Sequence, residues 1–139
     1  MGSRRKGREA ALRILYFMDV SHVSGTQAIK SYWGHLAGHG EPAEEVDFAN
    51  QLVRAYADHE GEVDELIRSA SHHWRLERMP IVDRNVLRVA IVELREMGDI
   101  PKRVTLNEAV ELAKRFGSEG SGSFVNGVLD RIATELGKS

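Results

Sequence analysis

The sequence of 139 residues contains no cysteine. It therefore forms no disulfide, and a thiolate nucleophile or a zinc site built on cysteine is excluded. No apolar run approaches the roughly 18 residues that span a bilayer, so we expect no membrane-spanning segment. The basic start leads into an amphipathic pattern and not into an unbroken apolar stretch, so we also expect no secretory signal. These absences favour a cytoplasmic protein.

Motifs that carry catalysis are missing as well. The sequence shows no nucleophile beside a base, no pair of carboxylates at a telling spacing and no phosphate-binding loop with its lysine. His35 and His39 are four residues apart, but a metal site usually needs three or four ligands. We expect no enzyme activity, no metal and no cofactor. The stretch GSEGSGS at residues 117–123 is either a flexible connector or, before a helix N-terminus, a contact for the phosphate backbone.

Apolar residues recur at helical spacing along almost the whole chain, and no stretch alternates as a strand does. The pattern predicts about seven helices: one over residues 8–20, one from residue 26, one from residue 42, one that ends before Met79-Pro80, and three that open near Asp83, Thr105 and Phe124. Asp83 is expected to be an N-cap, and Thr105 to begin a capping box. The predicted fold is all-α: a single domain over residues 1–139, formed by a compact bundle with sub-bundles over about 4–72 and 81–137.

Positive charge is concentrated at the N-terminal end of a slightly acidic chain. The protein has 19 Lys and Arg against 21 Asp and Glu, yet residues 4–13 carry five cations and the single acid Glu9. A helix that begins with cations is poorly matched to its own dipole, and Gly7 weakens it further, so we expect residues 3–8 to fray in the free protein. Such a segment is typical of one that orders on a polyanion. A solubilising tail and a membrane-surface contact are the alternatives.

Three stretches of the sequence resemble one family. NEAVELAKRFG at residues 107–117, FVNGVLD at residues 124–130 and the arginine-rich start RRKGREAALRILY are similar to the NusB transcription antitermination factors. The resemblance implies an all-α fold of two packed sub-bundles, without catalysis or a cofactor. It implies binding to single-stranded boxA RNA together with the ribosomal protein NusE. It also implies an indirect association, through other Nus factors, with RNA polymerase, on which the complex suppresses termination in ribosomal RNA operons. Some members pair with themselves, so a homodimer stays open.

The resemblance also assigns roles to individual residues. The RNA-binding residues it implies are Arg4, Arg5, Lys6, Arg8, Tyr16, Lys102, Arg103, Gly120 and Phe124. The cations would follow phosphates while the aromatic rings stack on unpaired bases. The residues implied for the protein partner are Trp74, Glu77 and Asp83. Gly120 and Ser123 depart from the Asp and Lys that the family commonly has in this loop, which puts base preference there in doubt.

Two other functions remain open from the sequence. One is a NusB-like module for protein interaction or dimerisation that no longer binds RNA, which the altered loop at residues 117–123 motivates. The other is a regulatory domain related to the RNA cytosine methyltransferases of the RsmB type, because those enzymes carry a similar module.

Overall fold

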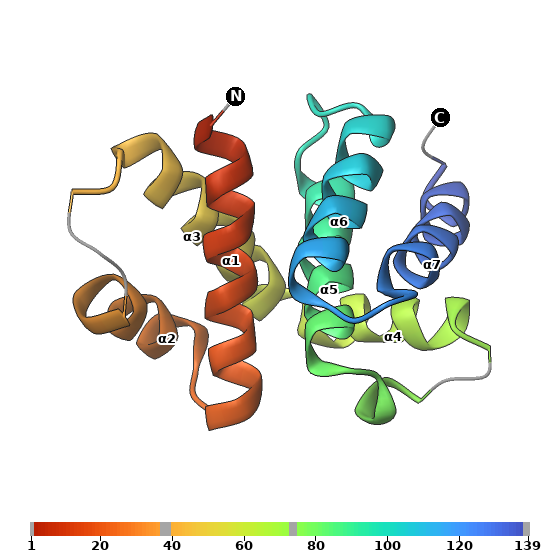
Figure 1. Cartoon of the computed structure of the whole chain (residues 1–139), viewed down its shortest axis with the longest axis horizontal. Helices are drawn as coiled ribbons and strands as arrows, with labels where there is room; N and C mark the ends of the chain where they lie inside the picture. The colour runs from red at the N-terminus through yellow and green to blue at the C-terminus, as the bar shows by residue number, and fades with distance from the viewer. Residues whose placement is uncertain (1, 37–39, 73–74, 138–139) are drawn as a thin grey trace. The chain divides into compact units, whose positions relative to one another are not determined.

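The computed structural model describes residues 2–36, 40–72 and 75–137. Over these residues the chain forms seven α-helices, one π-helical turn and one 3-10 turn, with no strand (Figure 1). The helices are α1 (Gly2–Ser21), α2 (Gly25–Ser31), α3 (Ala43–Asp58), α4 (Glu60–Ala70), α5 (Ile81–Glu96), α6 (Lys102–Phe116) and α7 (Ser121–Glu135). The π-helical turn is Tyr32–Leu36 and the 3-10 turn is Leu76–Arg78. The predicted all-α class is confirmed.

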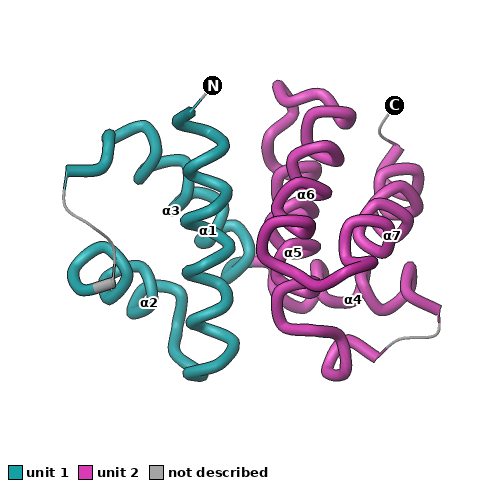
Figure 2. The backbone as a smooth tube through the Cα atoms, viewed as in Figure 1, with its two compact units in different colours: residues 1–58 teal, residues 59–139 magenta. Residues whose placement is uncertain are grey.

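The chain consists of two compact units, residues 1–58 and residues 59–139 (Figure 2). The seam was expected around residues 73–82, with the fourth helix in the N-terminal part. The division instead follows Asp58, because α4 packs on α5 and α7 and so belongs to the second unit.

In the first unit, α1 packs along α3, and α2 contacts both helices. The inner face of α3 is the one its spacing predicts, and its residues Phe48, Ala49, Leu52, Val53 and Tyr56 are all buried. α1 lies close to α3 at Gly7, where a Cβ would be 2.9 Å from Phe48 Cδ2 and 3.2 Å from the Glu45 carbonyl oxygen. Only glycine allows this approach.

The expectation that residues 3–8 fray is wrong, because α1 is helical from Gly2 onwards. The guanidinium groups of Arg4 and Arg8 lie 5.4 and 5.5 Å from the centre of the Phe48 ring. Cations over an aromatic face are attracted by the ring quadrupole. Together with the close packing at Gly7, these contacts hold the first turns of α1 against α3 despite their unfavourable charge.

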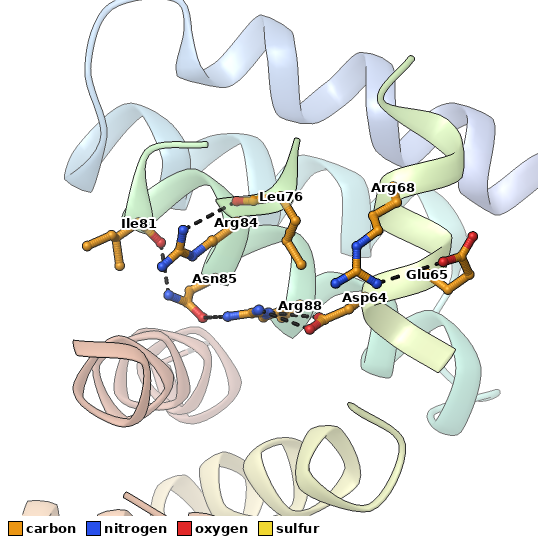
Figure 3. A network of polar contacts seen from close by, with 8 residues as sticks. All are labelled: Asp64, Glu65, Arg68, Leu76, Ile81, Arg84, Asn85 and Arg88. Carbon is orange, nitrogen blue, oxygen red and sulfur yellow. Dashed lines mark hydrogen bonds and ion pairs between the residues drawn. The ribbon is translucent and has the colours of Figure 1, made fainter. Parts of the chain in front are cut away.

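In the second unit, α5 contacts α4, α6 and α7, and every residue from 85 to 94 is buried. A buried polar network joins α4 to α5 (Figure 3). Arg88 donates to both carboxylate oxygens of Asp64, at 3.0 and 3.1 Å, and to Asn85 Oδ1 at 3.0 Å. Asn85 in turn donates to the Ile81 carbonyl.

Both predicted caps in this unit are wrong. α5 begins at Ile81, after Pro80, so Asp83 is its third residue. α6 begins at Lys102, after Pro101, so Thr105 lies inside the helix. Each polar side chain makes a tertiary bond instead: Asp83 accepts from Ser121, and Thr105 donates to the buried carboxylate of Glu93.

Candidate nucleic-acid interface

The N-terminal turns of α1 present exposed cations on the first unit. Arg4, Arg5 and Lys6 are exposed, and the first turn holds no acid. The free N–H groups of a helix N-terminus add positive potential to these side chains. Arg8 differs, because it is only 5% exposed and lies against the Phe48 ring. The arginine-rich start therefore separates into three accessible cations and one arginine that packs inside the unit.

Tyr16 lies farther along α1 and is 41% exposed. The ring is therefore accessible from solvent. Arg13, three residues earlier, is also exposed, and residues three apart share one side of a helix. Arg13 was counted in the charge of the segment but not among the RNA-binding residues. The geometry adds it as a cation beside an accessible ring.

A second group of predicted residues meets at a pocket in the second unit. The pocket has a volume of about 230 Å³. Its lining comes from the start of α5, the loop between α6 and α7, and the first turn of α7: Pro80, Asp83, Ser118, Glu119, Gly120, Ser121 and Phe124. Gly120 and Phe124 were predicted to bind RNA, and the structure brings both to this pocket. Ser118, Glu119 and Ser121 belong to the stretch 117–123, for which a phosphate contact was one of two interpretations, whereas Pro80 was not predicted for the site.

The loop between α6 and α7 has a defined conformation. Gly120 adopts a φ of 90°, in the left-handed region that favours glycine. The glycine that replaces the family's usual Asp therefore fits its backbone. Ser121 follows as the first residue of α7, and its hydroxyl accepts from the Ser118 N–H at 3.1 Å. This loop carries one carboxylate, Glu119, and no cation.

Lys102 and Arg103 lie at the start of α6. The Lys102 ammonium pairs with Asp130 at 3.3 Å, whereas Arg103 is exposed. α6 has 15 residues, so at 1.5 Å per residue its ends are about 22 Å apart. The loop with Gly120 follows the other end of α6. The structure therefore does not bring Lys102 and Arg103 to the pocket, and Arg103 is the more accessible cation of the two.

The residues predicted for a protein partner have different surroundings. Asp83 is only 4% exposed, and its carboxylate accepts from Ser121 Oγ at 2.8 Å. Glu77 is exposed on the 3-10 turn. Arg84 of α5 donates to the backbone carbonyls of Leu76 and Glu77, at 3.3 Å each, and so connects this turn to α5. Trp74 lies outside the described residues. Glu77 is thus the accessible acid of this segment.

Negative charge follows the surface of α3 and α4. On α4, Arg95 donates to Glu62 Oε1 at 3.2 Å, and His59 Nδ1 lies 3.0 Å from the same oxygen. The hydrogen bond from Arg95 is the main cause that lowers the pKa of Glu62 below its ordinary value, and His59 adds to it.

Among the described residues, no three His, Asp or Glu side chains are grouped as a metal site. None of the described helices has the length and apolar character to cross a membrane.

Known proteins with similar sequences and structures share one description. The NusB family model matches residues 5–134. The transcription antitermination protein NusB of Myxococcus xanthus is 47% identical over 139 residues, 99% of each chain. The protein of that name in Sorangium cellulosum is 49% identical over 99% of this chain and 96% of its own length.

Solved structures agree with this match. T. maritima NusB has a TM-score of 0.87 at 37% identity, over 95% of this chain and 91% of its own. A chain in a crystal structure of the antitermination factors NusB and NusE with double-stranded RNA has a TM-score of 0.85 at 27% identity, over 97% of this chain and 99% of its own. The chain described here belongs to the NusB family.

Proposed function

We propose that this protein is a transcription antitermination factor that binds single-stranded boxA-type nascent RNA. The exposed cluster of Arg4, Arg5 and Lys6 at the start of α1 carries the proposal, because cations at a helix N-terminus attract phosphates without sequence preference. The names of the relatives in Myxococcus xanthus and Sorangium cellulosum support the function. Tyr16 and Phe124 would provide rings for unpaired bases, and Arg103 a further cation.

The protein would act with the ribosomal protein NusE and, through other Nus factors, on RNA polymerase in ribosomal RNA operons. The crystal structure of NusB and NusE with RNA supports this pairing. We place the contact with the basic ribosomal protein at Glu77, because Asp83 is buried and bonded within the unit. Residues 1–139 would form one RNA-binding domain that works in the cytoplasm and catalyses no reaction.

Fluorescence anisotropy tests the proposal with a labelled boxA-like RNA, a scrambled RNA of equal length and a duplex RNA. Each is titrated with the protein at several salt concentrations, with and without NusE. The expected result is tighter binding of the boxA-like strand than of the other two, strengthened by NusE. The duplex is included because the RNA in the related crystal structure is double-stranded.

Two results would contradict the proposal in different ways. Equal and salt-sensitive binding of all three RNAs would reduce the cations to a nonspecific electrostatic contact. Absence of RNA binding, even with NusE, would favour a module for protein interaction. That second function draws on the loop at residues 117–123, which has Ser123 where the family commonly has a lysine and so offers no cation to phosphate.

A further inference from the structure

The Ser121 hydroxyl joins two segments that are far apart in the sequence. It donates to Asp83 Oδ1 at 2.8 Å and accepts from the Ser118 backbone N–H at 3.1 Å. Ser121 is 2% exposed and Asp83 is 4% exposed, so water does not replace these bonds readily. A hydrogen bond to a buried carboxylate is stronger than one between neutral groups. The bond therefore ties the loop between α6 and α7 to the first turn of α5.

The surrounding backbone is shaped around this hydroxyl. A Cβ on Gly117 would lie 2.6 Å from Ser121 Oγ and 2.7 Å from the Ala113 carbonyl, so a side chain there would displace one of them. Gly120, immediately before Ser121, adopts the left-handed conformation that lets the chain turn into α7. Gly117 thus leaves room for the serine side chain, and Gly120 provides the backbone conformation that precedes it.

The same bond determines where the walls of the pocket lie. Ser118, Glu119, Gly120 and Ser121 form one wall, and Pro80 and Asp83 belong to the start of α5. The Phe124 N–H donates to the Gly120 carbonyl at 3.0 Å, so the aromatic residue of the pocket is fixed relative to the loop. Loss of the Ser121–Asp83 bond would release the loop from α5 and let the pocket change shape.

We propose that Ser121 and Asp83 are positioning residues for RNA binding, which hold the 118–121 loop and Phe124 in the arrangement that receives RNA. This inference rests on the proposed function. It assigns the Asp83 carboxylate to the inside of the RNA-binding surface and not to contact with a protein partner. Neither side chain needs to touch RNA, because each acts through the position of the loop.

The test compares substitutions that remove the bond with substitutions that keep it. Ser121→Ala and Asp83→Ala remove it, whereas Asp83→Asn keeps an oxygen that accepts from the Ser121 hydroxyl. Ser69→Ala and Ser123→Ala are matched controls, because the first removes an exposed serine-to-carboxylate bond, to Glu65 on α4, away from the pocket, and the second alters an exposed serine of the same helix turn. Each variant is measured for exchange of the Ser118 amide by NMR without RNA, and for affinity to the boxA-like strand well below its unfolding temperature.

We expect Ser121→Ala to exchange the Ser118 amide about tenfold faster and to bind RNA about tenfold more weakly. Asp83→Ala should lose a similar factor, and the double variant no more than either alone, because both remove one bond. Asp83→Asn should keep most of the affinity, because its amide oxygen still accepts from the Ser121 hydroxyl. The two controls should match the unsubstituted protein.

Unchanged exchange in Ser121→Ala would show that the bond does not hold the loop. Faster exchange with unchanged RNA affinity would show that loop position does not matter for RNA. Either result overturns the inference. If the unsubstituted protein bound no RNA at all, the proposed function would fail with it, and the exchange data would still decide whether Ser121 holds the loop.

Discussion

The cations at the start of α1 allow a quantitative test of the proposed contacts with RNA phosphates. Arg5 and Lys6 are exposed, whereas Arg8 is buried and Arg4 also contacts the Phe48 ring. Replacing Arg5 and Lys6 by alanine therefore removes two exposed charges and leaves the contacts of Arg4 and Arg8 with the Phe48 ring in place. Alanine favours the helix at least as well as the residues it replaces, so α1 should stay formed.

The size of the effect follows from counterion release. Each phosphate contact on a single strand contributes about 0.7 to the slope of log affinity against log salt, so two contacts contribute about 1.4. Between 50 and 200 mM salt, a slope difference of that size corresponds to about a sevenfold difference in affinity loss. The variant should therefore bind more weakly at low salt and be less sensitive to added salt.

Fluorescence anisotropy over that salt range measures both slopes, and far-ultraviolet circular dichroism checks that helix content is retained. The matched control is Lys30→Ala with Arg54→Ala, which removes the same charge from exposed positions on α2 and α3 of the same unit. If the control flattened the slope as much as the Arg5 and Lys6 variant, net charge alone would explain the effect. An unchanged slope in the test variant would refute a phosphate contact at these two residues.

Three further predictions concern the second unit. Phe124→Ala should weaken RNA binding by about 1–3 kcal/mol with the fold intact, because the ring is half-buried at the pocket. The control Phe116→Ala removes a half-buried ring that does not line this pocket and should not weaken binding. Equal losses in the two variants would contradict base stacking by Phe124. Asp64→Ala should lower the free energy of unfolding, measured with urea, by about 3–5 kcal/mol, because Arg88 would remain buried without the carboxylate of Asp64. A loss below about 1 kcal/mol would contradict a stabilising role for this ion pair. Glu62 should titrate below the ordinary range of a glutamate when followed by NMR. Because its pKa is lowered in the folded state, its contribution to stability is present above the unfolded-state pKa and is lost as the pH falls through the folded-state pKa. Arg95→Ala should raise the titration midpoint of Glu62, and an unmoved midpoint would refute the contact.

Hydrophobic periodicity was enough to predict the all-α class. On α5, Val86, Leu87, Ala90, Ile91 and Leu94 recur at helical spacing, and all five are buried. Helix ends were less accurate, as the early start of α1 and the late positions assigned to the starts of α5 and α6 show. A polar residue before an apolar run fits both an N-cap and a first-turn residue with a tertiary partner. Pro80 and Pro101, which directly precede α5 and α6, were local signals for the true helix starts.

The candidate site was predictable where it depends on residue type and less so where it depends on burial. Phe124 and Gly120 line one pocket, and their role in RNA binding stays a prediction. The tertiary role of Ser121 was not predicted, because a serine in a Gly/Ser-rich stretch before a helix indicates a flexible connector or a local cap. Its partner Asp83 is 38 residues away, and only the fold shows that the two side chains meet.

The difference between Arg8 and its neighbours changes how the N-terminal segment would bind. A frayed cationic tail loses conformational entropy when it orders on RNA, which weakens the contact that its charges make. Here α1 is helical from Gly2, because Gly7 lets α3 approach and the Phe48 ring lies against the guanidinium groups of Arg4 and Arg8. The accessible cations are therefore held on a formed helix before RNA arrives. The charge that makes this helix start unfavourable in isolation is stabilised by α3, and at Arg5 and Lys6 it remains exposed on the surface.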